Sequence, residues 1–148
     1  MKRKILSLNQ IFNSILFLLV LLWTYTLGSK LANFDTFRHE LSMQHLPRPV
    51  LKPLSYALPV SELIVVILLI IPGTRKSGLI CSITLFIIFT VYILLILLNY
   101  FKSTPCSCGG VLKVMSWKTH FLFNLFFIVI NAVNLSIFNK IERRLKAK

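Results

Sequence analysis

Two cysteines separated by one residue form the part of the sequence best suited to chemistry. Residues 102–110 read Lys-Ser-Thr-Pro-Cys-Ser-Cys-Gly-Gly, and Cys106 and Cys108 are two of the three cysteines in the chain. A disulfide between such close cysteines is strained and exchanges readily, and the thiolate is the reactive form. We therefore predict that Cys106 and Cys108 carry out thiol–disulfide exchange.

Two other interpretations of this turn stay open. The pair could tie its own loop without reacting, or it could supply half of a metal site together with His120. No fourth ligand is evident from the spacing, so we assign no metal. The third cysteine, Cys81, lies among Ile and Leu residues, where an inert packing role is expected.

Polar residues within apolar segments are the next candidates. Glu62 is the one acidic residue inside a predicted membrane span, where a carboxylate is costly unless it faces the protein interior. In the last apolar segment, polar side chains fall on one helix face at about 100° per residue, namely Trp117, His120, Asn124, Asn131 and Asn134. We expect Glu62, His120 and Asn124 to tune protonation near the cysteines. A purely structural role, in which Glu62 and the asparagines bond helices together, stays open.

Lys30 and Asp35 are accessory candidates that follow the first apolar segment. Both are expected at the same surface as the cysteine turn. Their simplest role is an exposed ion pair, which contributes little to stability.

The elements that position these residues are membrane helices. Of the 148 residues, 56% are hydrophobic and 14% are charged, and the mean hydropathy is +0.79. Segments long enough to cross a bilayer lie at about residues 11–27, 54–71, 78–101 and 117–138. We predict one all-α integral membrane domain, residues 1–148, built as a bundle of four transmembrane helices.

A short amphipathic helix is expected between the first and second spans. Phe34, Phe37 and Leu41 recur at helical spacing with polar residues between them, as in a helix on a membrane surface. Three prolines, Pro47, Pro49 and Pro53, are expected to end it and lead into the second span.

The basic residues indicate how the chain is oriented. The net charge is +13, and Lys and Arg are densest in the two tails and in the turn between the second and third spans. This distribution predicts that both termini are cytoplasmic and that the Cys106–Cys108 turn faces outward, on the side where disulfides persist. A signal peptide at residues 1–28 is disfavoured because its apolar stretch is too long. Nucleic acid is excluded as a partner because no separate basic domain exists; the lipid bilayer is the expected surrounding.

These segments resemble the DoxX/MauE family of small redox-associated membrane proteins, in the MauE-like branch. The resemblance rests on motifs in a fixed order: Gly28-Ser29-Lys30-Leu31 with Phe34-Asp35-x-Phe37, Pro59-x-x-Glu62-Leu63, Pro105-Cys106-Ser107-Cys108-Gly109-Gly110, and Ser116-Trp117-Lys118-x-His120-x-x-x-Asn124. It implies disulfide handling beside a thioredoxin-like partner in methylamine dehydrogenase maturation and, through the DoxX branch, a link to quinone-coupled sulfur oxidation. Gly109-Gly110 stand where Cys-Phe-Gly is common, which leaves the substrate undecided.

The leading hypothesis is an inner-membrane thiol–disulfide exchange component with a periplasmic thioredoxin-like or oxidoreductase partner. One alternative is a non-catalytic anchor or assembly subunit of such an oxidoreductase. Another is a quinone-binding or transport subunit that uses Glu62. A quinone is the one cofactor considered and is not assigned, because no second cysteine pair is available to relay electrons inward. Whether the chain is itself an enzyme stays open.

Overall fold

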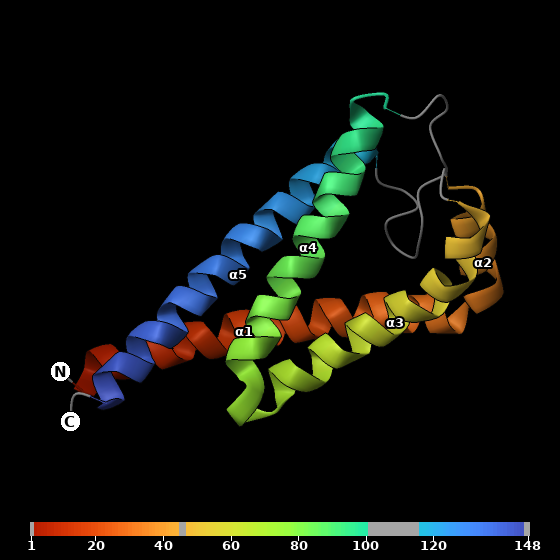
Figure 1. The fold of residues 1–148 in the computed structure, drawn as a ribbon. Helices are drawn as coiled ribbons and strands as arrows, with labels where there is room; N and C mark the ends of the chain where they lie inside the picture. Colours follow the sequence, from red (N-terminus) through yellow and green to blue (C-terminus); the bar gives the residue numbers. More distant parts are fainter. Residues whose placement is uncertain (1, 45–46, 101–115, 147–148) are drawn as a thin grey trace.

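The computed structural model describes residues 2–44, 47–100 and 116–146, and within these ranges the chain forms helices and no strands. Four helices are long and apolar enough to cross a membrane, which confirms the predicted all-α, four-span architecture (Figure 1). In chain order the elements are α1 (Lys2–Ala32), α2 (Phe34–Ser42), α3 (Arg48–Ile70), the 3₁₀ turn η1 (Pro72–Thr74), α4 (Arg75–Leu97) and α5 (Trp117–Lys146).

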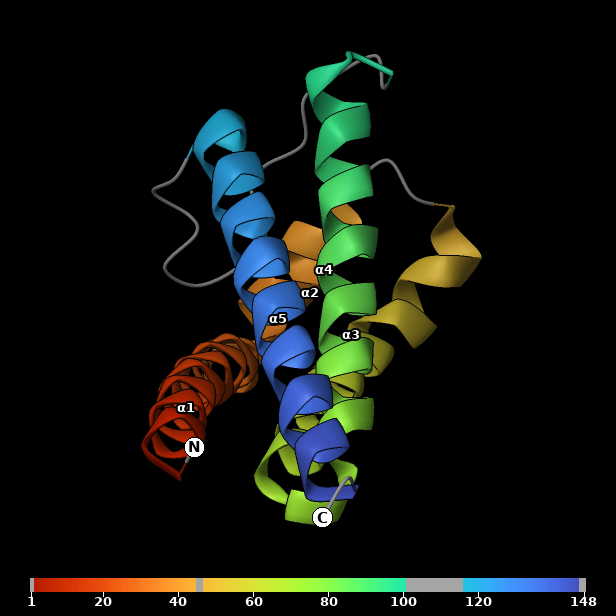
Figure 2. The same cartoon turned by 90° about the vertical axis from the view of Figure 1, so that its left-hand side faces the viewer.

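The four long helices form a ring in which each packs most extensively against two neighbours. α1 packs against α3 and α5, and α4 packs against the same two helices. The end of α1 that carries the N-terminus lies beside the end of α5 that carries the C-terminus (Figures 1 and 2). The C-terminal ends of α1 and α4 and the N-terminal end of α5 therefore lie at the other end of the bundle.

The core is apolar and aromatic. Its buried members include Leu19 and Trp23 of α1 and Leu69 of α3. The Trp23 ring lies 4.8 Å from that of Phe86 in α4, which in turn stacks at 5.8 Å on Phe127 of α5. Many large apolar side chains point outward instead, such as Phe17 and Leu122, and a bilayer is the solvent in which such a surface is stable.

α3 begins earlier than predicted, because its prolines start the helix instead of preceding it. Pro47 is the N-cap, Pro49 lies in the first turn, and Pro53 and Pro59 lie inside the helix. Proline is tolerated in a first turn because the amide hydrogens there have no helical acceptor. The second span was expected to start near residue 54, but the helix begins at Arg48 and its candidate membrane span at Pro49.

α4 ends earlier than predicted. The third span was expected to reach Phe101, but the helix ends at Leu97. Asn99 has a positive φ of 53°, and the Tyr100 amide donates to the Leu95 carbonyl over 3.1 Å. This left-handed residue and the long-range bond form a Schellman motif, in which Asn is an accepted substitute for Gly.

α2 confirms the amphipathic helix, since Phe37 and Leu41 are its buried residues. It packs mainly against α3, where the Phe34 ring lies 5.5 Å from Tyr56. At its end, the Tyr92 hydroxyl of α4 donates to Gln44 Oε1. The sequence did not predict this bond, which attaches the residues after α2 to α4, in addition to the packing of α2 against α3.

α3 and α4 lie close together at Gly78. A Cβ atom added there would lie 2.8 Å from the backbone carbon of Leu68 and 2.9 Å from the Leu69 nitrogen. The absent side chain therefore sets the distance between these helices next to their connecting turn.

Candidate functional site

A buried ion pair between α1 and α3 forms the centre of the candidate site. Lys30 Nζ lies 2.7 Å from Glu62 Oε1, and the exposed fractions of the two side chains are 14% and 1%. Lys30 Nζ also donates to the Thr26 carbonyl over 3.3 Å. The second carboxylate oxygen, Glu62 Oε2, is buried and has no hydrogen-bond partner in the described part of the chain.

Helix lengths explain why Lys30 reaches Glu62. The first helix was expected to end near residue 27, but α1 continues to Ala32 and keeps Lys30 in its last turn. The long apolar stem of lysine then passes along the helix while the ammonium group bonds the carboxylate. Lys30 pairs with Glu62 instead of forming the expected surface ion pair with Asp35. Asp35 lies exposed in the first turn of α2.

His120 and Asn124 lie one helical turn apart on α5, and His120 is within electrostatic range of the Lys30 ammonium group. His120 Nδ1 and Asn124 Nδ2 are both buried without a partner among the described residues. The structure thus adds Lys30, which was expected in a surface ion pair, to Glu62 and His120, which were expected to act together. Asn124 lies on the same face of α5 as His120.

Deeper in the bundle, the polar stripe of α5 meets two residues that were not predicted to interact. The Ser82 hydroxyl of α4 accepts a hydrogen bond from Trp23 Nε1 over 2.8 Å and another from Asn131 Nδ2 over 2.6 Å. Asn134 is fully buried, and neither of its side-chain polar atoms has a partner in the described chain. The inward-facing stripe is confirmed, and for Asn131 it joins three helices.

The cysteines proposed as reactive, Cys106 and Cys108, lie outside the described residues. Their segment joins the end of α4 to the start of α5, since α4 ends at Leu97 and α5 begins at Trp117. His120 is in the first turn of α5. Cys81 is a free, half-buried cysteine that packs against the apolar core, in agreement with a packing role.

This arrangement supplies acid–base groups at one end of a membrane bundle. It combines a fixed cation, a carboxylate with one uncommitted oxygen, and an imidazole. Such groups can accept, hold or donate a proton, or bind a polar atom that enters between the helices. The sequence found each residue from its type but could not find the pairing, which depends on how far α1 extends.

The family model described as "Methylamine utilisation protein MauE" matches residues 8–137. The match therefore covers most of the chain and includes every residue of the candidate site. It supports the MauE branch of the expected resemblance, and nothing in it supports the DoxX branch. Neither the curated proteins nor the solved structures give a match.

Proposed function

Because this chain belongs to the MauE family of membrane proteins, we propose that it is an inner-membrane thiol–disulfide exchange component that acts with a periplasmic thioredoxin-like or oxidoreductase partner. Cys106 and Cys108 undergo thiol–disulfide exchange with the partner, and the Lys30–Glu62 pair and His120 assist the accompanying proton transfers. The observation that carries the proposal is the buried ion pair at 2.7 Å, on the side of the bundle to which the cysteine segment is attached.

Electrons and protons balance between this chain and its partner protein, and no third reactant is needed. A thiolate of the partner attacks the Cys106–Cys108 disulfide, a mixed disulfide forms, and one cysteine of this chain leaves as a thiolate. The second thiolate of the partner then closes the partner's own disulfide and releases the other cysteine. Two electrons pass to this chain, and two protons are taken up by its thiolates. The reverse direction reduces the partner.

The acid–base groups support this step for an electrostatic reason. A thiolate is stabilised by a nearby cation, and a thiolate that leaves must be protonated. Lys30 is held by Glu62, and His120 lies within reach of the Lys30 charge. We propose that the Lys30 charge stabilises the leaving thiolate and that His120 acts as a proton acceptor or hydrogen-bond donor beside it, with Asn124 orienting the imidazole or a polar atom of the partner.

The test is a trapping experiment in the native membrane. With Cys108→Ser, Cys106 should attack a partner disulfide and remain in a mixed disulfide that reductant releases, because the resolving thiol is absent. Cys81→Ser is the matched control and should behave as the unchanged protein, since Cys81 packs in the core. Alkylation of free thiols in acid-quenched cells, followed by mass analysis, reports both states.

The Cys106→Ser/Cys108→Ser variant distinguishes thiol exchange from an accessory role. If thiol exchange is the function, the oxidation state of the partner should change in that variant. An unchanged oxidation state of every periplasmic client would contradict the proposal.

A second candidate is a membrane anchor or assembly subunit, which the family description favours because it names a utilisation pathway and not a reaction. In that case the double cysteine variant should still co-purify with its partner oxidoreductase and support its activity. A quinone-binding or transport role, in contrast, predicts that Glu62→Gln abolishes function while both cysteines are dispensable. The same variants therefore separate the three functions.

A further inference from the structure

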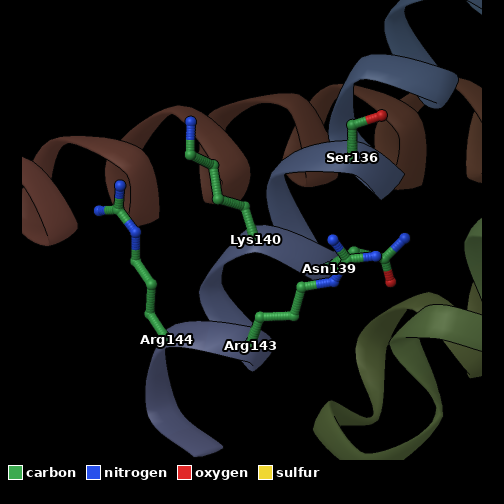
Figure 3. A pocket seen from close by; sticks show the side chains of 5 residues that line it. All are labelled: Ser136, Asn139, Lys140, Arg143 and Arg144. Atoms are coloured by element: carbon green, nitrogen blue, oxygen red, sulfur yellow. The ribbon is translucent and has the colours of Figure 1, made fainter. Parts of the chain in front are cut away.

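The opposite end of the bundle carries a basic pocket that the proposed function does not use. An open pocket of about 540 Å³ lies along the C-terminal part of α5. Its lining combines three cations with two neutral hydrogen-bonding side chains (Figure 3), namely Ser136, Asn139, Lys140, Arg143 and Arg144. The spacing of these residues by three and four positions places them along one side of the helix.

The three cations of this pocket have no carboxylate partner among the described residues. The nearby Glu142 is already engaged, at 2.7 Å from Lys146 and 3.9 Å from Lys76. Lys140, Arg143 and Arg144 belong to none of the ion pairs of the described chain. The pocket therefore carries a positive charge that no carboxylate of the described residues compensates, and an anion from outside the protein can bind there.

The position of the neutral residues suggests how such an anion is held. Ser136 and Asn139 precede Lys140 and Arg143 by one helical turn each, and so lie closer to the membrane interior. A phosphate between the two levels could accept hydrogen bonds from the hydroxyl and the amide while the cations compensate its charge.

An exposed apolar stripe continues from the pocket along α5. At about 100° per residue, four apolar residues lie within about 40° of Lys140 on the helix. All four are exposed large hydrophobic side chains, namely Leu122, Phe126, Val129 and Val133. The buried Asn131 lies on the opposite face. One side of α5 thus presents an apolar track that ends in cations.

From this combination we propose that the pocket binds the phosphate headgroup of an anionic phospholipid, with an acyl chain along the stripe. The leaflet is the one on the side of the chain termini, where the ends of α1 and α5 lie together (Figure 1). The cations select for net negative charge, and the apolar track selects a lipid over a soluble phosphate. The ligand class is therefore an anionic glycerophospholipid such as phosphatidylglycerol.

The experiment measures lipid binding to the full chain by native mass spectrometry from detergent. The probes are phosphatidylglycerol and phosphatidylcholine of equal chain length, so that only headgroup charge differs. The unchanged protein should retain phosphatidylglycerol preferentially. Lys140→Gln/Arg143→Gln/Arg144→Gln should weaken that binding by about tenfold or more, because each interfacial cation contributes to the attraction.

A charge-matched control comes from the other end of the bundle. Arg38→Gln/Lys52→Gln/Lys118→Gln removes the same number of charges from exposed positions and should leave binding unchanged. If the triple pocket variant fails to fold, as judged by its thermal transition, Arg143→Gln alone should still weaken binding.

Three results would overturn the proposal. These are equal retention of both lipids by the unchanged protein, equal loss in the pocket and control variants, and displacement of the lipid by glycerol 1-phosphate at the same concentration. The last result would mean that the pocket binds a soluble phosphate and that the apolar stripe contributes nothing.

Discussion

Lys30 and Glu62 depend on each other unequally. Glu62 is 1% exposed and lies within the α3 span, whereas Lys30 is 14% exposed and lies in the last turn of α1. If Glu62 is removed, the lysine stem can extend and carry its charge to water at the membrane surface. If Lys30 is removed, the carboxylate has no such escape, because its side chain is short and enclosed.

Lys30→Met is therefore expected to lower the free energy of unfolding by about 3 kcal/mol, and Glu62→Gln by less. The double variant should lose less than the sum of the two, with a coupling of about 1–3 kcal/mol. Denaturant titration in detergent measures all three. The exposed Lys146–Glu142 pair has the same 2.7 Å distance but side chains that are 75% and 36% exposed, and its equivalent cycle should show no measurable coupling. Equal coupling in both pairs would contradict the role of burial.

Ser82 is expected to stabilise the bundle through its hydroxyl oxygen. Ser82→Ala leaves both Trp23 Nε1 and Asn131 Nδ2 without their acceptor, and the cost should be about 1–3 kcal/mol. In a Trp117→Phe background Trp23 is the sole tryptophan of the chain, so its emission reports the lost bond directly. Thr84→Ala is the control, because the Thr84 hydroxyl bonds only its own helix at Ile80; a similar loss there would refute the interpretation.

The type of each residue was predictable, but its partner was not. Helical periodicity correctly predicted that Asn124 and Asn131 face inward, because the side that a residue faces follows from local geometry. Ser82 gave no such signal, since serine in an apolar helix commonly bonds its own backbone, as Thr90 does here. The pairing of Lys30 with Glu62 depends on contacts between distant segments, which no local pattern contains.

At the scale of elements, the number and order of helices followed from hydropathy, whereas their ends followed from single residues. The prolines at residues 47–53 were expected to end the amphipathic helix and to precede the second span, yet α3 begins among them, since the first turn of a helix does not require all its amide hydrogens. Asn99 ends α4 through a left-handed conformation that its short polar side chain tolerates. These choices depend on backbone dihedral angles, which composition does not specify.

Two glycine substitutions are predicted to change the stability of the protein in opposite directions, because Gly78 lies at the close crossing of α3 and α4 and Gly28 does not. Gly78→Ala would place a Cβ within 2.8 Å of the Leu68 backbone, so the helices must separate at a cost of about 1–3 kcal/mol. Gly28→Ala meets no atom within 4 Å and should stabilise α1 by about 0.5–1 kcal/mol through helix propensity. Thermal unfolding of the two variants in one detergent tests this. A loss of stability in both would show that α1 needs Gly28 for another reason.

At the scale of the whole molecule, the two ends of the bundle differ in chemistry. One end holds the Lys30–Glu62 pair and His120, and it receives the segment with Cys106 and Cys108. The other holds the basic pocket of α5 and the aromatic contact of Arg75, whose guanidinium carbon lies 6.0 Å from the Phe12 ring centroid. A redox exchange at the first end requires an oxidising compartment, whereas the cations of the second fit the cytoplasmic side.

Cysteine accessibility in cells should reveal this asymmetry. In a background of Cys81→Ser, Cys106→Ser and Cys108→Ser, the exposed Ser116 and Gly73 can each be replaced by the single cysteine of the chain. Ser116 precedes α5, and Gly73 lies in η1 between α3 and α4, so the two positions lie at opposite ends of antiparallel helices. With the termini cytoplasmic, a membrane-impermeant maleimide should label Ser116→Cys in intact cells and Gly73→Cys only after permeabilisation. The reverse pattern would place the cysteine segment in the reducing cytoplasm, where a persistent disulfide could not form, and would remove the compartment on which thiol exchange with a periplasmic partner depends.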